Sequence, residues 1–174
     1  NSLNLITSKP MLYICNVDEN SIINGNNFSN SIREKAKKES SETVIVSAAT
    51  ESQIAEFDNE NDKLEMLKDL GLNETTLKKV IHAGYNLLSL ITFFTCIPKE
   101  TRAWTVNKNT TAPKAAGKIH TDFEKGFIRV ETIAYDDFTN LNGETACREA
   151  GKLRLEGKDY IVKDGDILHF LFNS

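Results

Sequence analysis

Asn16, Asp18 and Glu19 place one amide and two carboxyl groups directly after a short apolar run at residues 12–15. An apolar run of this length predicts a buried strand, so these side chains follow a strand end. In open α/β sheets, ligands bind in the crevice at the carboxyl ends of parallel strands. These residues therefore indicate a ligand site, and the competing interpretation is a plain strand-end turn with a helix cap.

A second strand end of the same kind follows at Ser47 and Ala48, after the β-branched residues 43–46. Between the two runs, residues 28–40 have a helical pattern in which Ser29 is a candidate N-cap. Strand, helix and strand in this order predict a βαβ unit whose parallel strands end at one edge of a sheet. Ser47 is also a suitable helix N-cap, and that role is compatible with a ligand site.

Composition excludes several other classes of protein. The 174 residues are 40% hydrophobic and 26% charged with a formal net charge of −4, which is typical of a globular chain without a global attraction to nucleic acid. The three cysteines are widely spaced, which indicates reduced thiols in a cytoplasmic protein, and none has zinc spacing with a histidine. His120 is therefore interpreted as structural. The longest apolar run, at 87–94, is too short to cross a bilayer, so no membrane is expected.

Helices are expected between about residues 50 and 90. Thr50 and Gln53 have the spacing of a capping box, and Gly71 is placed to end a helix. Asn73 is a candidate N-cap for the next helix. That helix has an apolar face formed by Leu77, Val80, Ile81, Gly84 and Leu88.

From residue 91 the pattern changes to strands, which divides the chain into parts at 1–90 and 91–174. Aromatic and β-branched residues at 91–96 and 102–106 predict two strands. Pro113 predicts the first turn of a helix that crosses between strands. A mixture of this kind predicts a small α+β domain.

Two further strand patterns lie near the C-terminus. Ile128, Val130, Thr132 and Ala134 alternate along one predicted strand and should share a side. The dipeptide Asp164-Gly165 predicts a tight turn or hairpin between two apolar strands within residues 160–172.

Longer stretches carry a family resemblance. The segments "CIPKETRAWTVNKNTTAPKAAGKIHTDFEKGFIRVETIAYDDF" and "EAGKLRLEGKDYIVKDGDILHFLFN" closely resemble the C-terminal domain of the Obg-like ATPase (YchF) family. That domain is of the TGS type, which implies a β-grasp fold similar to ubiquitin. The segments "KPMLYICNVDE" and "VIVSAATE" resemble the second half of the family's P-loop domain. The resemblance thus implies a partial P-loop NTPase βαβ unit with helices at 1–90, followed by a β-grasp domain at 91–174.

The resemblance also implies what the first strand end recognises. P-loop GTPases usually carry Asn-Lys-x-Asp there, and the Asp accepts hydrogen bonds from N1 and the 2-amino group of guanine. This chain has Asn16, Val17, Asp18 and Glu19 at the four positions. The longer carboxylate of Glu19 is misplaced for guanine, whereas the amide of Asn16 can pair with adenine N6 and N7. Val17 is expected to contact the base plane, and the backbone at Ser47 and Ala48 to approach the base, with ATP preferred over GTP.

The catalytic parts are expected outside these residues. No Gly-x-x-x-x-Gly-Lys-Ser/Thr loop, which cradles phosphates in P-loop enzymes, occurs in the sequence. Together with a first residue that is Asn rather than Met, this predicts the C-terminal half of a longer ATPase. The ligands of the ATP phosphates and of Mg²⁺ would lie upstream. No catalytic residue and no metal ligand is predicted here, and the chain alone is predicted to be inactive.

Basic residues are dense between positions 99 and 129, where seven of them face three acidic residues. They are Lys99, Arg102, Lys108, Lys114, Lys118, Lys125 and Arg129. TGS domains occur in proteins that work near the ribosome and tRNA, so the stretch predicts a surface for the ribosome or structured RNA. The competing interpretation is an ordinary solvated surface.

Two hypotheses of function follow. In the first, the chain is part of a ribosome-associated ATPase. In the second, the TGS domain is a non-enzymatic module that binds RNA, the ribosome or a protein. A TGS domain from a threonyl-tRNA synthetase or a stringent-response enzyme fits less well, because those chains lack the two strand ends before it. A monomer is the working expectation.

Overall fold

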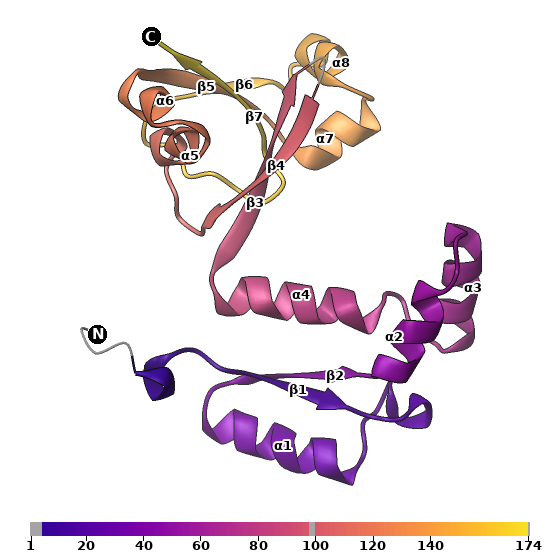
Figure 1. Cartoon of the computed structure of the whole chain (residues 1–174). Coiled ribbons are helices and arrows are strands. Elements are labelled where there is room, and N and C mark those ends of the chain that lie inside the picture. The colour runs from indigo at the N-terminus through magenta and orange to yellow at the C-terminus, as the bar shows by residue number, and fades with distance from the viewer. Residues whose placement is uncertain (1–4, 98–99, 174) are drawn as a thin grey trace. The chain divides into compact units, whose positions relative to one another are not determined.

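The computed structural model describes residues 5–97 and 100–173. The chain divides into two compact units, an N-terminal unit that ends at Leu88 and a C-terminal unit that begins at Ser89 (Figure 1). This junction falls two residues before the boundary expected from the change of pattern at residue 91. No helix among the described residues is long and apolar enough to cross a membrane.

The N-terminal unit contains the predicted βαβ arrangement. Its parts are β1 (Leu12–Asn16), α1 (Asn27–Lys38) and β2 (Glu42–Val46). The two strands are parallel, and their register pairs Asn16 with Val46, so both strands end at the same level. The prediction of a parallel pair joined by a helix is confirmed.

The remaining elements of this unit are short helices. They are the 3-10 turns η1 (Ile6–Ser8) and η2 (Glu19–Ser21) and the helices α2 (Ala48–Ala55), α3 (Glu60–Asp69) and α4 (Thr76–Leu87). Buried Ile22, Ile54, Leu67 and Leu72 form a core cluster among them. Three members of the apolar face predicted for this last helix, Leu77, Ile81 and Leu88, are exposed.

The observed N-caps differ from the predicted ones by two or three residues. Asn26 caps α1, and the side chain of Ser29 closes the capping box by accepting a bond from the Asn26 amide at 2.8 Å. Ser47 caps α2, so the capping box expected at Thr50 is wrong. Thr75 rather than Asn73 caps α4. Several Ser, Thr and Asn residues precede each helix, and the side chain that reaches an N3 amide determines the cap.

Gly71 ends α3 as predicted. Its φ is +68°, and its N–H donates to the carbonyl oxygen of Lys68 at 3.0 Å. The N–H of Leu72 donates to the carbonyl oxygen of Leu67 at 2.8 Å. The left-handed backbone that closes these bonds favours glycine, because a Cβ is strained there.

A five-stranded sheet organises the C-terminal unit, in the order β4-β3-β7-β5-β6. The strands are β3 (Leu90–Ile97), β4 (Glu100–Asn107), β5 (Phe127–Ile133), β6 (Arg154–Glu156) and β7 (Ile167–Phe172). The central pair β3–β7 is parallel, and the other neighbours are antiparallel. The order makes β4 and β6 the edge strands.

Four helices accompany this sheet. They are α5 (Ala112–Ile119), α6 (Thr121–Lys125), α7 (Tyr135–Asn140) and α8 (Glu144–Glu149). α5 is the predicted helix with Pro113 in its first turn, and its buried alanines pack into a core cluster with Phe93, Val130 and Leu168. α7 and α8 were not expected, because segments of six residues are too short to show a helical period.

Two strand predictions in this unit are wrong. The register of β5 against β7 shifts between Phe127 and Arg129, so Ile128 is 49% exposed instead of sharing the buried side of Val130. A bulge of this kind inserts one residue and reverses the alternation before it. Only one strand, β7, lies within residues 160–172. Asp164 and Gly165 do form a tight turn, but it bonds to Thr92 of β3 rather than joining two strands.

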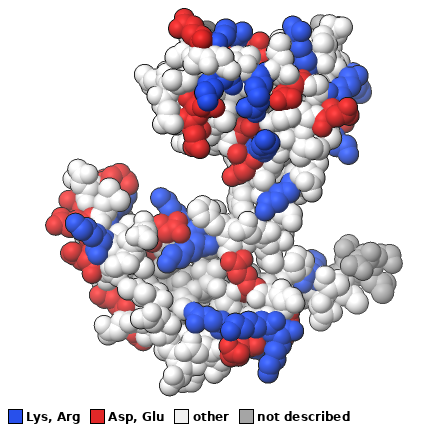
Figure 2. Space-filling model, turned by 180° about the vertical axis from the view of Figure 1, so that it is seen from behind, with Lys and Arg blue, Asp and Glu red and all other residues white. Residues whose placement is uncertain are grey.

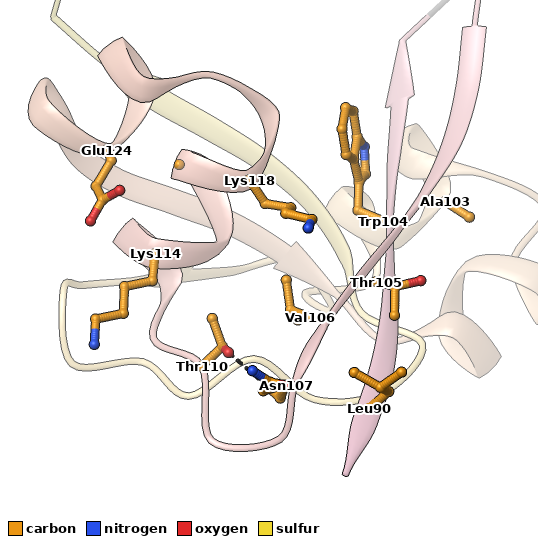
Figure 3. A pocket seen from close by; sticks show the side chains of 11 residues that line it. Leu90, Ala103, Trp104, Thr105, Val106, Asn107, Thr110, Lys114, Lys118 and Glu124 are labelled. Atoms are coloured by element: carbon orange, nitrogen blue, oxygen red, sulfur yellow. Dashed lines mark hydrogen bonds between the residues drawn. The ribbon is translucent and has the colours of Figure 1, made fainter. Parts of the chain in front are cut away.

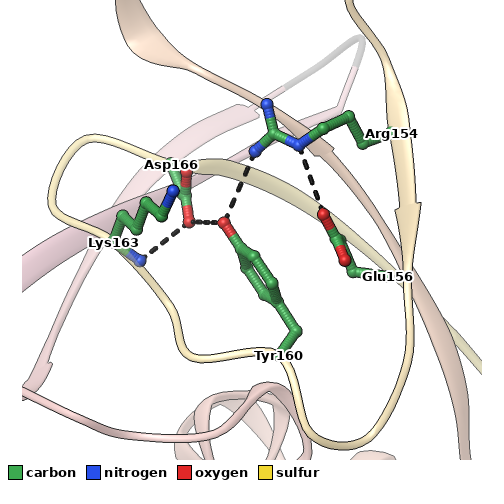
Figure 4. Close-up of polar contacts among 5 residues, drawn as sticks. All are labelled: Arg154, Glu156, Tyr160, Lys163 and Asp166. Carbon is green, nitrogen blue, oxygen red and sulfur yellow. Dashed lines mark hydrogen bonds and ion pairs between the residues drawn. The ribbon is translucent and has the colours of Figure 1, made fainter.

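A buried carboxylate organises the segment before β7 (Figure 4). Asp166 is 3% exposed, and its Oδ2 accepts a bond from the Tyr160 hydroxyl at 2.7 Å and from the Lys163 N–H at 2.8 Å. Arg154 extends the network by bonding both the Tyr160 oxygen, at 3.5 Å, and Glu156, at 3.2 Å. Burial and the bond to Asp166 raise the pKa of Tyr160 to about 12. The bond from Lys163 satisfies a backbone N–H in a segment that has no strand partner there.

Candidate functional site

The two predicted strand ends meet in the N-terminal unit. The Val17 N–H donates to the Val46 carbonyl oxygen at 2.9 Å, which extends the parallel ladder beyond β1. Next to this bond, the side-chain Oδ1 of Asn16 accepts a bond from the Ala48 N–H at 3.0 Å. Asn16 and Ala48, 32 positions apart in the sequence, are thereby brought together.

This contact restricts what Asn16 can offer to a base. Its amide oxygen is engaged by Ala48, whereas its Nδ2 group has no partner among the described residues. An amide nitrogen only donates, so this group suits the N7 acceptor of a purine better than its exocyclic amino group. N7 is an acceptor in both adenine and guanine, so this contact would not distinguish them. Discrimination between the two bases would have to come from other groups.

Glu19 is the polar side chain that remains available at the first strand end. Its residue is exposed at the start of η2, and no hydrogen bond or ion pair to its carboxylate occurs among the described residues. Asp18 is instead engaged as the N-cap of η2, where its carboxylate accepts a bond from the Ser21 N–H at 3.0 Å. The structure therefore separates the two acids into a capping residue and a free one.

Val17 and Ser47 have buried side chains. Val17 is 9% exposed, so little of its surface is available to a base plane, which was its predicted role. Ser47 is fully buried, and its Oγ accepts bonds from the N–H of Thr50 at 3.4 Å and from its hydroxyl at 3.0 Å. The capping interpretation of Ser47 is thus confirmed. At Ser47 itself a base could meet only the backbone.

One positioning contact had no signal in the sequence. The carboxylate of Glu51 on α2 accepts bonds from the N–H and the hydroxyl of Thr76, at 2.5 and 2.7 Å. Thr76 is fully buried at the start of α4, so this carboxylate joins the two helices. Because α2 begins directly at Ala48, the contact also holds the second strand end in place.

The predicted basic residues do not form a single group. Arg102 pairs with Glu100 at 3.3 Å and lies over the ring of Trp104. Lys114 and Lys118 line a hollow between β4 and α5, whereas Lys125 lines a different one and Lys108 and Arg129 line neither. Lys99 lies outside the described residues. On the face of the C-terminal unit that Figure 2 shows, basic and acidic side chains are interspersed, so it has no field of one sign.

Comparisons with known proteins are consistent along the whole chain. Residues 90–173 match the family model YchF-GTPase_C, described as "Protein of unknown function (DUF933)". A "Ribosome-binding ATPase YchF" from Haemophilus influenzae is 58% identical over 172 residues, which are 99% of this chain and 47% of that protein. "Obg-like ATPase 1" from Rattus norvegicus is 43% identical over 98% of this chain and 43% of that protein. The chain belongs to the YchF family of Obg-like ATPases.

A solved structure agrees with this membership. The structure of the Schizosaccharomyces pombe YchF GTPase matches with a TM-score of 0.83 and 39% identity, over 98% of this chain and 46% of that one. The mixed α/β fold is thus the fold of this part of the YchF family. The chain spans about half the length of the curated relatives it matches.

A magnesium ion has no ligand set in the part of this YchF-family chain that the structure describes. No group of three or more His, Cys, Asp or Glu side chains comes together there in a way that could hold a metal ion. Asn16 and Ala48 offer only an amide and a backbone group, which suit a base rather than Mg²⁺. Asn16 and Ala48 therefore offer groups that suit the base end of a nucleotide rather than its metal-bound phosphates.

Proposed function

We propose that this chain supplies base-recognition loops to a cytoplasmic, ribosome-associated P-loop ATPase that prefers ATP over GTP. The observation that carries the proposal is the bond between Asn16 and Ala48, because it joins the two strand ends at which the family resemblance implies that the base is read. The free Nδ2 of Asn16 would donate to the purine N7. The phosphates and Mg²⁺ of the bound ATP would be held by residues outside this chain.

The proposal assigns the C-terminal unit to the β-grasp fold of TGS domains. In sequence order its strands are arranged 2-1-5-3-4 with a parallel central pair, and the helices α5 and α6 lie between the second and third strands. That arrangement is the one expected of a ubiquitin-like domain, and the fold alone does not define a ligand. The Haemophilus influenzae relative is named a ribosome-binding ATPase, which supports a contact of this unit with the ribosome or structured RNA.

The chain by itself is expected to hydrolyse neither ATP nor GTP. Phosphoryl transfer is catalysed almost entirely by positioning and electrostatic stabilisation of the phosphates, and the loop that does this is absent from the sequence. Phosphate release should stay at the level of buffer in a preparation free of contaminating ATPases. Turnover that stays with the chain through successive purification steps would contradict the assignment of catalysis to residues outside it.

Ribosome binding tests the second part of the proposal. The chain should sediment with ribosomal subunits, and the logarithm of its affinity should fall with the logarithm of salt concentration with a slope of about −2 to −3, as for about three phosphate contacts. The double variant Lys114→Glu with Lys118→Glu should bind roughly tenfold more weakly at low salt, because two attractive charges become repulsive. Lys37→Glu with Lys38→Glu, on exposed α1, is the matched control. Equal binding of wild type and both variants at every salt concentration would mean that α5 does not face the ribosome.

A further inference from the structure

The hollow between β4 and α5 brings together two features that suit a nucleotide. It has a volume of about 720 Å³, and Trp104 lies on its strand side whereas Lys114 and Lys118 lie on its helix side. Figure 3 shows the Lys118 side chain reaching from α5 toward the strand that carries Trp104. All of these residues belong to the C-terminal unit. The hollow is therefore complete within one compact body.

The indole of Trp104 is held as a fixed platform. Its Nε1–H donates to the Thr95 hydroxyl oxygen on β3 at 2.9 Å, and the guanidinium of Arg102 lies 5.2 Å from the ring centroid. The residue packs in part against the core cluster of this unit and is half-buried, so only the rest of its ring stays open. The guanidinium covers one face, and a stacked base would take the side that lines the hollow. A ring already held in place loses little freedom on stacking, which favours binding of a base.

Lys114 and Lys118 have positively charged groups without an acidic partner among the described residues. Lys114 and Lys118 are one helical turn apart, so their side chains leave the same face of α5. Both are exposed, and neither forms an ion pair within residues 5–97 and 100–173. Glu124 is the acidic residue at the rim of the hollow, against two cations. Unpaired ammonium groups at this spacing can each meet one of two successive phosphates.

The helix approaches the rim closely because of Gly117. A Cβ at this position would lie 2.2 Å from Glu124 Oε2 and 3.0 Å from Glu124 Cβ, so glycine allows α6 to pack closely against α5. β4 is an edge strand, so its outward backbone N–H and C=O groups also border this space.

We propose that this hollow binds an unpaired nucleotide of an RNA strand. The base stacks on Trp104, its phosphate meets Lys118, and the next phosphate along the strand meets Lys114. The inference rests on the proposed contact of this unit with RNA and names the element of RNA that it recognises. Stacking tolerates any base, so recognition is of an unpaired residue rather than of a sequence. A free nucleotide has the same base and one of the two phosphates, and would use only part of the site.

Trp104 is the only tryptophan of the chain, so its fluorescence reports directly on stacking. Titrating the full 174-residue chain with octauridylate should quench this fluorescence. A blunt RNA duplex should not quench it. Uridine monophosphate should quench it only at roughly tenfold higher concentration than octauridylate. Trp104→Phe should keep most of the affinity for octauridylate, measured by anisotropy of a labelled strand. Trp104→Leu should lose about tenfold.

Charge variants separate the hollow from the basic stretch as a whole. Lys114→Gln with Lys118→Gln should weaken octauridylate binding about tenfold and make the salt slope shallower by roughly 1, as for two lost contacts to single-stranded phosphates. Lys108→Gln with Lys125→Gln, which changes two exposed lysines outside the hollow, should change the affinity less than about twofold. Circular dichroism of each variant verifies that the fold is kept.

Four results would overturn the inference. Octauridylate could bind without changing Trp104 fluorescence, or both lysine pairs could have equal effects. Uridine monophosphate could bind as tightly as the strand, which would assign the hollow to a free nucleotide. Octaglutamate could quench where octauridylate does not, which would assign it to an acidic peptide at the edge of β4. If ribosomes sediment with the chain in any of these cases, the proposed function stands without this site; if neither ribosomes nor octauridylate bind, the proposed RNA contact fails as well.

Discussion

Replacing Asp166 by alanine is expected to lower the free energy of unfolding of the C-terminal unit by about 2–4 kcal/mol. The carboxylate is 3% exposed and accepts bonds from the Tyr160 hydroxyl and the Lys163 N–H. Alanine would leave both donors without this acceptor and would remove the negative charge near Arg154. Bonds to a charged group contribute more than neutral ones, so the effect exceeds that of an ordinary surface change.

Urea unfolding followed by Trp104 fluorescence measures this effect, because the single tryptophan reports on the C-terminal unit alone. The matched control is Asp159→Ala, which removes an exposed acid from the turn just before Tyr160 and should change the stability by less than about 0.5 kcal/mol. A loss below about 1 kcal/mol for Asp166→Ala would show that Lys163 and Tyr160 find other partners at little cost.

The same network predicts an alkaline limit to stability. The pKa of Tyr160 is raised from 10.0 to about 12 in the fold, so its protonated form is favoured there. Its contribution is therefore complete below pH 10 and is lost as the pH rises through about 12. The difference in unfolding free energy between wild type and Tyr160→Phe should accordingly shrink over this interval. A difference that stays constant from about pH 8 to about pH 12 would contradict the assignment.

Replacing Asn16 by alanine is expected to raise the Kd for ATP about 10- to 100-fold in the longer protein that also carries the phosphate-binding part. Alanine removes the Nδ2 donor that the proposal directs to the purine N7. It also leaves the Ala48 N–H without the acceptor that holds the second strand end. Both losses act on the same base contact, and isothermal titration calorimetry measures their sum.

Asn16→Asp separates the two effects. A carboxylate can still accept from the Ala48 N–H, but it cannot donate to N7. If the Nδ2 donor contacts the base, Asn16→Asp should bind ATP as weakly as Asn16→Ala. Asn61→Ala, which changes an exposed amide on α3, should bind ATP with wild-type affinity. Wild-type affinity of Asn16→Asp would mean that this amide positions the loop and does not touch the base.

Selectivity is expected to depend on Glu19. Because N7 is common to both purines, the contact from Asn16 leaves the choice of base to other groups. Glu19→Asp should shift the ratio of GTP to ATP affinity toward GTP by about tenfold, since the shorter carboxylate suits guanine N1 and its amino group. Val17 should be kept in this test, because its burial means that a lysine there would cost stability. An unchanged ratio would place base selection elsewhere.

Elements with a local pattern of residues could be predicted from the amino-acid sequence. Hydrophobic periodicity and helix start and stop signals predict three of them. These are the parallel strands around a helix, the aromatic strands β3 and β4, and the helix α5 with its initial proline. The role of Gly71 could be predicted because the left-handed conformation that ends many helices favours glycine. Family membership was also carried by the sequence, in long stretches such as the one around "AAGKIHTDFEKGF".

Which side-chain groups remain available to a ligand depends on contacts that form only in the folded chain. The bond from the Ala48 N–H to Asn16 spans 32 positions. It occupies the amide oxygen of Asn16, although from the sequence both the oxygen and the nitrogen of this amide could have bound a base. Burial likewise withdrew Val17 from the proposed base site, and packing of α5 beside β4 put Trp104 next to Lys114 and Lys118. Residue type sets what a side chain can donate or accept, but its unused capacity depends on neighbours that only the folded chain brings within hydrogen-bond distance.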